Sequence, residues 1–329
     1  MILHPPVMAL LLVAALGAAT LVWSGRFAVR LLRHWDLSSG ASRQLEIERR
    51  TELVATLVAV VLASQGVALL LTVFNADRTA PLLAGAMCAF GSFNASPYGF
   101  PALEVKLALF LLSSVWLAVH LVDVQAPDYP LTRRKYAFLL GLVPLGLADA
   151  ALSLAYYLDL QPDQLTSCCG MAFKAERSGL GGHAAALDPA LSLALLAGAG
   201  LLTGAVAWAA GRRRAWAMAY GVQSLLFAGV GLVAVVSAVS IYVYEHPHHH
   251  CPFCLLKAEY GYFGFLLYGP LFAGLAAGVA SGFLSWRPPV GLADRLVQVS
   301  TRLRRLSVSG FALFGLLCAL AVLRSGLRL

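Results

Sequence analysis

The sequence predicts an all-α, polytopic integral membrane protein with about eight transmembrane helices. Of its 329 residues, 60% are apolar and only 12% are charged, whereas a soluble globular domain carries about 25% charged residues. Several apolar runs also exceed the ~18 residues that are typical of a bilayer-spanning helix. We therefore interpret residues 1–329 as a single transmembrane helical domain that is embedded in a lipid bilayer.

The eight spans follow one another with short connections and no room for a soluble domain. The net charge is +8, but the arginines gather in short clusters between apolar runs, where they set membrane topology. Nucleic acid is therefore excluded as a partner. The predicted spans are Val7–Trp23, Leu53–Phe74, Ala102–Val122, Ala137–Leu158, Ala190–Gly211, Met218–Tyr244, Leu255–Trp286 and Val308–Leu323.

The distribution of basic residues predicts the orientation. One set of alternate connections holds 17 basic residues, and the opposite set, with the C-terminal tail, holds five. The larger set is Arg26, Arg30, Arg33, Arg43, Arg49, Arg50, Arg133, Arg134, Lys135, Arg212, Arg213, Arg214, Arg287, Arg295, Arg302, Arg304 and Arg305. The smaller set is Arg78, Lys174, Arg177, Arg324 and Arg328. Because basic loops stay in the cytoplasm, both termini are predicted outside, as in a bacterial inner membrane with the opposite face in the periplasm.

Two connections on the predicted cytoplasmic side, about 26–50 and 291–306, are amphipathic. In the first, Arg26 and Arg30 share one helical face while apolar residues share another. Basic amphipathic segments of this kind normally lie in the plane of the lipid headgroups.

Five of the six cysteines fall in the three connections on the predicted outer face. They are Cys88 in the first connection, Cys168 and Cys169 in the second, and Cys251 and Cys254 in the third. Cys318, alone in the last span, is interpreted as a small buried apolar residue.

The three cysteine segments share a loose pattern when they are aligned on Cys88, Cys168 and Cys251. The separations are 80 and 83 residues, and each interval covers two spans and their loops. Either a threefold repeat of helical hairpins or coincidence within a small set of residue types accounts for the similarity. A repeat predicts that the cysteines converge on one site.

The pair Cys251-Pro252-Phe253-Cys254 is the sharpest local signal. Two intervening residues allow the sulfurs to form a disulfide or to bind one metal ion. The pair is predicted to open the seventh span, where helix amides stabilise a thiolate, and Lys257 one turn later adds a positive charge. The environment suits a redox-active pair and a thiolate metal ligand alike.

The run from Cys251 to Lys257 resembles the cysteine pair that opens the second span of DsbB-type quinone reductases. It is similar also to the corresponding pair of vitamin K epoxide reductases. The resemblance covers about fifteen residues and implies thiol–disulfide exchange with a quinone as the electron acceptor. Those DsbB-type enzymes have four spans, and their basic residue stands where this chain has Ala258, with Lys257 just before it.

A metal site is the second interpretation, because imidazole and thiolate ligands suit zinc and copper. Histidines directly precede the cysteine pair. The candidate ligands are Cys88, Cys168, Cys169, His248, His249, His250, Cys251 and Cys254.

Three functions therefore remain open. The first is an outward-facing thiol–disulfide redox protein with Cys251 and Cys254 as the proximal pair and Cys88, Cys168 and Cys169 as a relay, working with a periplasmic partner protein or other membrane subunits. The second is a copper- or zinc-binding protein for metal delivery or transport, and the third is a non-catalytic subunit with structural disulfides. We favour the first, because a lysine follows a cysteine pair at a helix start.

Two features of the spans call for a structural explanation. Asp149 falls in the middle of the fourth span, where a carboxyl group needs a partner, a proton or water. From Cys251 to Trp286 there are 36 residues, or about 54 Å of helix at about 1.5 Å per residue, which is too long for one span unless it projects outward or bends at Pro270.

Overall fold

The computed structural model describes residues 4–35, 42–125, 129–162, 165–166, 180–286 and 293–327. Every regular element within them is a helix. Eight helices are long and apolar enough to cross a membrane, so the predicted fold class and number of spans are confirmed for the described part of the chain. The orientation of the termini and the threefold repeat stay predictions.

The chain divides into two compact units. The first unit comprises Met1–Asn75, Ser96–Gln161 and Arg287–Leu296, and the second comprises Ala76–Ala95, Pro162–Trp286 and Val297–Leu329.

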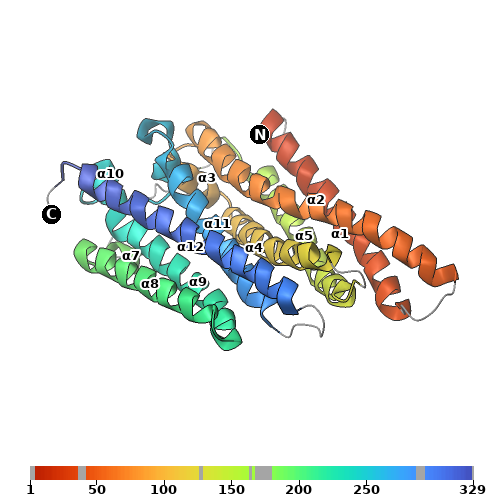
Figure 1. Cartoon of the computed structure of the whole chain (residues 1–329). Helices are drawn as coiled ribbons and strands as arrows, with labels where there is room; N and C mark the ends of the chain where they lie inside the picture. The colour runs from red at the N-terminus through yellow and green to blue at the C-terminus, as the bar shows by residue number, and fades with distance from the viewer. Residues whose placement is uncertain are drawn as a thin grey trace. The chain divides into compact units, whose positions relative to one another are not determined.

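The first unit is built on four long helices. They are α1 (Pro5–His34), α2 (Ser42–Thr79, whose last turn belongs to the second unit), α4 (Gly99–Val124) and α5 (Thr132–Asp159). Helix α5 packs against both α1 and α4 (Figure 1). All four helices contribute to one apolar core, which includes Leu31, Val58, Leu109 and Leu139.

A buried ion pair joins α4 to α5 within this unit. Lys106 Nζ lies 2.8 Å from Asp149 Oδ1, and the two side chains are 5% and 3% exposed. Lys106 also donates a hydrogen bond of 3.0 Å to Asp149 Oδ2. Of the explanations open for Asp149, the structure therefore supplies a charged partner.

The second unit holds the remaining spans and the short helices between them. They are η1 (Ala80–Leu82), α3 (Ala89–Asn94), α7 (Leu180–Ala185), α8 (Pro189–Ala210), α9 (Arg214–Ala234), the π-helical turn η2 (Val235–Val239), α10 (Ser240–Tyr244), η3 (Cys254–Leu256), η4 (Ala258–Tyr260), α11 (Phe263–Leu284) and α12 (Ala293–Arg324, whose first turn belongs to the first unit).

Glycines allow the long helices of the second unit to approach closely. Helix α9 packs against α8 and α11. At the α9–α11 crossing, a Cβ atom added to Gly282 would lie only 2.7 Å from Gly221 Cα. Only residues without a side chain let the two backbones meet at this distance.

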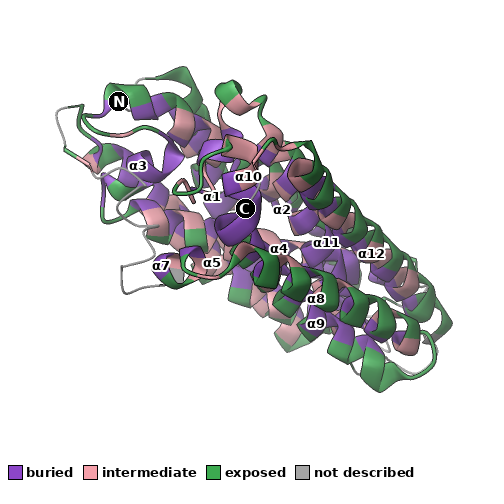
Figure 2. Cartoon of the chain, turned by 90° about the vertical axis from the view of Figure 1, so that its left-hand side faces the viewer, coloured by how far each residue is buried: buried purple, intermediate pink, exposed green. Residues whose placement is uncertain are grey.

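The outward faces of several spans are apolar. Leu201 on α8 is 78% exposed and Leu323 on α12 is 80% exposed, and Figure 2 shows exposed residues along the outer faces of both helices. Large apolar side chains that are exposed in this way fit contact with lipid rather than with water.

The seventh span begins later than the sequence predicts. We expected it to start near Leu255, but η3 and η4 precede it and α11 starts at Phe263. Gly261 and Tyr262 adopt left-handed backbone conformations, with φ of 61° and 56°, which separates the short turns from the span. The prediction that the cysteine pair opens a long helix is therefore wrong, and the excess length is explained by these turns.

The two amphipathic segments are parts of long helices. The described residues of the first segment belong to the end of α1 and the start of α2, and those of the second, from Ala293 on, belong to α12. Helix α2 has 38 residues, or about 57 Å at about 1.5 Å per residue, so it exceeds a hydrocarbon core of about 30 Å.

Candidate functional site

The candidate site lies in the second unit, where α3 meets the turn that contains the cysteine pair. Cys88 precedes the first residue of α3 and has an extended backbone, with φ of −160°. The Ser92 hydroxyl donates a hydrogen bond of 2.6 Å to the carbonyl of Ala76 at the end of α2. Gly85, with φ of +86°, turns the chain in a conformation that glycine tolerates best.

A second segment is fixed against the Cys88 segment. Thr166 N donates to Ala84 O at 3.0 Å, and Thr166 Oγ1 donates to Gly91 O at 2.9 Å. Cys168 and Cys169, which we predicted as part of the site, follow Thr166 in the sequence but lie outside the described residues.

Two tyrosine hydroxyls hold the turn of the cysteine pair. Tyr244 donates a hydrogen bond of 2.6 Å to Cys251 O, and Tyr268 donates one of 2.9 Å to Pro252 O. These bonds satisfy carbonyl groups that no helix ladder reaches, and they fix the backbone on both sides of the Cys251–Pro252 peptide bond.

Phe253, between the two cysteines of the pair, packs against α3. Its ring centroid lies 6.1 Å from those of both Phe90 and Phe93. Phe93 is completely buried. These aromatic contacts bring the pair beside Cys88, although 163 residues separate Cys88 from Cys251.

Three sulfurs meet as a result. The Sγ atoms of Cys88 and Cys251 are 3.7 Å apart, and those of Cys88, Cys251 and Cys254 all lie within 4.8 Å of one another. The three residues are 1%, 1% and 4% exposed. We call them the three-cysteine cluster, and two of the three cysteine segments that the sequence predicted to converge do so.

The histidines before the pair do not join this cluster. Within the described residues, no histidine or carboxylate is grouped with the three sulfurs at ligand spacing. His250 Nδ1 lies 3.0 Å from the carbonyl of Val236 in the π-helical turn η2, and the tilted ring of His249 has its centroid 4.2 Å from that of Tyr244. His248 N donates to His246 Nδ1 at 3.3 Å, so the four histidines contact other groups.

Lys257 lies near the cluster and pairs with an acid. Its Nζ is 2.8 Å from Glu259 Oε2. Partial burial lowers the pKa of Lys257, but the hydrogen bond and charge of Glu259, with smaller contributions from Cys254 and Asp77, outweigh this and hold the pKa above its ordinary value. Lys257 therefore keeps a positive charge beside Cys254, and it lies at the end of the single 3₁₀ turn that begins at Cys254.

Cys318 lies apart from the three sulfurs, in α12, and is 2% exposed. The prediction that it is a small buried residue is confirmed.

The cluster has the geometry for two kinds of chemistry. A separation of 3.7 Å is a contact between unbonded sulfurs, since a disulfide measures about 2.05 Å. Sulfurs that bind one tetrahedral Zn²⁺ at about 2.3 Å would be about 3.8 Å apart. Small movements of the three side chains would therefore allow either disulfide exchange or the binding of a thiophilic metal ion.

Four aromatic residues that position the three cysteines were not predicted from the sequence, namely Tyr244, Tyr268, Phe90 and Phe93. The available signal was local composition, because aromatic residues are dense both around Cys88 and around the pair. Aromatic side chains are common at membrane interfaces, however, so this density alone does not single out a site.

The chain matches no protein-family model, no curated protein and no solved structure. The resemblance to DsbB-type enzymes therefore rests on the segment around Cys251 and Cys254 alone, and function has to be argued from the cluster itself.

Proposed function

We propose that this protein is a membrane thiol–disulfide oxidoreductase that uses the three-cysteine cluster on the periplasmic face of a bacterial inner membrane. The observation that carries the proposal is the contact between Cys88 and Cys251, at 3.7 Å between sulfurs, beside Cys254. A third cysteine next to a Cys-x-x-Cys pair is the arrangement that intramolecular disulfide exchange requires, because a thiolate must reach a disulfide sulfur. The excess of basic residues in the opposite connections supports the orientation.

The exchange step balances within the cluster. When Cys251 and Cys254 form a disulfide, the Cys88 thiolate attacks Cys251 Sγ, the bond between Cys88 and Cys251 forms, and Cys254 leaves as a thiolate. The charge of Lys257, which acts on Cys254, favours that leaving group.

Net oxidation needs a donor and an acceptor of two electrons. A dithiol of an extracytoplasmic partner protein is the donor and becomes a disulfide. A lipid quinone, the acceptor that the resemblance implies, takes two electrons and two protons and becomes a quinol. Cys168 and Cys169 are placed between partner and cluster in this proposal.

The test is to trap the exchange intermediate. Purified protein is equilibrated in glutathione buffers of graded ratio, its thiols are blocked, and disulfides are mapped by mass spectrometry without reduction. Within the cluster, Cys254→Ser should accumulate the bond between Cys88 and Cys251, whereas Cys88→Ser should retain only the bond between Cys251 and Cys254.

Cys318→Ser is the matched control, since Cys318 is equally buried but lies outside the cluster. This variant should leave unchanged both the set of disulfides within the cluster and the glutathione ratio at which half of the protein is oxidised. The proposal is wrong if no disulfide within the cluster forms at any glutathione ratio, or if Cys254→Ser traps no bond to Cys88.

A thiophilic metal centre is the second candidate, because three buried sulfurs lie within 4.8 Å of one another. Reduced protein should then bind one Cu⁺ or Zn²⁺ ion, and each single Cys→Ser change in the cluster should weaken binding at least tenfold. Replacing His248, His249 and His250 together should leave metal content unchanged, since the histidines contact other groups. Metal lost with the histidine change would contradict this ligand set.

A further inference from the structure

The first unit contains a polar cavity that the cysteine chemistry does not use. Its volume is about 470 Å³, and it is lined by the start of α2, the end of α4, the start of α5 and the ends of the adjoining connections. A cavity of this size holds a small organic molecule or a lipid headgroup.

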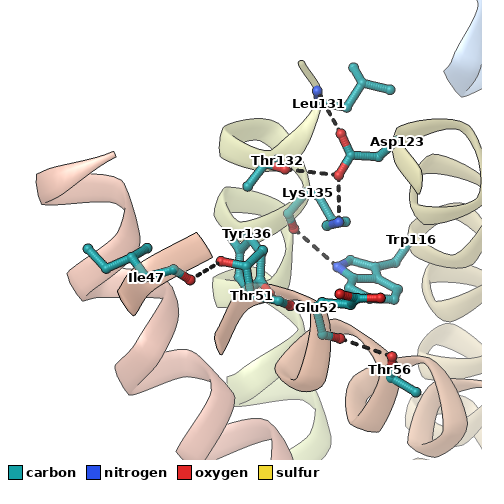
Figure 3. A network of polar contacts seen from close by, with 10 residues as sticks. All are labelled: Ile47, Thr51, Glu52, Thr56, Trp116, Asp123, Leu131, Thr132, Lys135 and Tyr136. Atoms are coloured by element: carbon teal, nitrogen blue, oxygen red, sulfur yellow. Dashed lines mark hydrogen bonds and ion pairs between the residues drawn. The ribbon is translucent and has the colours of Figure 1, made fainter. Parts of the chain in front are cut away.

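Lys135, which lines the cavity, is held by a hydrogen-bonded network (Figure 3). Asp123 Oδ1 accepts from Leu131 N at 2.9 Å, and Asp123 Oδ2 accepts from Thr132 Oγ1 at 3.0 Å and from Lys135 Nζ at 2.5 Å. Trp116 Nε1 donates to Lys135 O at 3.1 Å. Since Asp123 neutralises Lys135 and both are buried, the pair adds no net charge to the cavity.

Two carboxylates then set the charge of the cavity. Glu48 and Glu52 stand one turn apart on α2 and both line the cavity. Gln44 Nε2 donates to Glu48 Oε1 at 2.7 Å, but among the described residues neither glutamate forms an ion pair. Among the described lining residues the net charge is therefore negative, which favours a cation over an anion.

A histidine and two aromatic residues complete the lining. His120 Nδ1 is buried and has no hydrogen-bond partner, and its ring stacks on Trp116 with centroids 5.2 Å apart. Trp35 and Tyr129 supply aromatic surface, which attracts cations. Glu48, Glu52 and His120 are not grouped at metal-ligand spacing within the described residues, so a metal ion does not fit this arrangement.

We propose that this cavity binds a primary ammonium group. Such a group has three N–H donors and no acceptor, and the carboxylates of Glu48 and Glu52 in the lining are acceptors for these donors. A quaternary ammonium has the same charge but cannot donate a hydrogen bond. The ligand is therefore either a small soluble amine or the ethanolamine headgroup of a phospholipid.

The experiment uses the full-length protein in phosphatidylglycerol nanodiscs and an amine-free buffer. In the soluble arm, ethanolamine and choline are titrated by calorimetry. In the lipid arm, phosphatidylethanolamine and phosphatidylcholine are offered in equal amounts, and retained lipid is counted by native mass spectrometry. Binding of ethanolamine in either arm, at least tenfold over choline, supports the proposal, and the arm that responds identifies the source.

Charge-removing variants test the site itself. Glu48→Gln and Glu52→Gln keep side-chain size and should each weaken binding at least tenfold. Glu46→Gln is the matched control, because Glu46 lies on the same helix, pairs with Arg50 at 2.7 Å and does not line the cavity. Unfolding temperatures verify that each variant is folded. The proposal would be overturned if neither arm showed binding or if choline bound as tightly as ethanolamine. An equal loss of affinity in the Glu46→Gln variant would overturn it as well.

Discussion

Lys257 carries a positive charge close to the three-cysteine cluster. Its pKa is raised above the ordinary value, so the ammonium form, and the stabilisation that it draws from Glu259, is complete at neutral pH. That stabilisation is lost only as the pH rises through the raised pKa. Across the range in which thiols ionise, Lys257 therefore acts as a constant charge.

A change at this residue should move the ionisation of the neighbouring thiols. We expect Lys257→Gln to shift the pH profile of cluster alkylation to higher pH, because a nearby cation stabilises a thiolate. The rate of iodoacetamide labelling of the reduced protein, followed by mass spectrometry, measures this profile. Lys257→Arg keeps the charge and should leave the pH profile unchanged. If Lys257→Gln and the wild-type protein gave identical profiles, the charge of Lys257 would not act on the thiols.

At the scale of helices, the pair between Lys106 and Asp149 joins α4 to α5 inside the first unit. Removal of one member leaves the other charge buried without a partner, which costs about 3–5 kcal/mol in comparable pairs. We expect Asp149→Leu to lower stability by this amount and the double change with Lys106→Met to recover most of it. Unfolding in denaturing detergent measures both.

Glu104 provides the control for this pair. It lies two residues before Lys106 on α4 and is exposed, so Glu104→Gln should leave stability nearly unchanged. A double variant no more stable than Asp149→Leu alone would show that the pair contributes something other than charge compensation.

The contact between α9 and α11 predicts opposite effects for two glycine substitutions. A Cβ at Gly282 would lie 2.7 Å from Gly221 Cα, whereas a Cβ at Gly229 on α9 would meet nothing within 4 Å. Gly282→Ala should therefore destabilise the second unit by about 1–3 kcal/mol through overpacking. Gly229→Ala should be neutral or stabilising by up to about 1 kcal/mol, since alanine favours helix over glycine. Thermal unfolding of both variants in the same detergent measures these changes in stability. If both substitutions destabilised the protein, the result would contradict the close contact.

At the scale of the whole molecule, the basic residues predict that both chain ends lie outside. Alkaline phosphatase fused after Leu327 should then be active in intact cells, because the enzyme folds only outside the cytoplasm. The same enzyme fused after Arg213, in a predicted cytoplasmic connection, should be inactive, and the reverse pattern would invert the proposed orientation.

Composition and apolar run length were enough to predict an all-helical protein with eight spans. A bilayer requires apolar side chains, and it requires helices long enough to cross its hydrocarbon core. Helix ends were predicted less well, since the basic amphipathic stretches continue the spans. The sequence predicts helix from Leu255 because η3, η4 and α11 form a nearly continuous apolar run whose only charged residues are Lys257 and Glu259, and the backbone break falls at Gly261 and Tyr262.

The candidate site was predictable in part. Spacing suggested that Cys88 and Cys251 converge, and their sulfurs do meet. The partner of Asp149 could not be predicted, because the register between α4 and α5 decides which residue faces it. For the same reason, the histidines looked like ligands in the sequence although the fold directs them to a carbonyl group and a tyrosine ring.

The long separation between Cys88 and Cys251 also has a consequence for biosynthesis. The partner of Cys88 is made 163 residues later, which takes on the order of 10 to 30 seconds at about 5–20 residues per second. During this interval the early thiol is chemically competent while its final neighbours do not yet exist, and Cys168 and Cys169 are synthesised before Cys251. The order of synthesis therefore presents Cys88 with other sulfurs first. If Cys88 pairs with one of them in an oxidising compartment, the cluster forms only after that disulfide is reduced or isomerised.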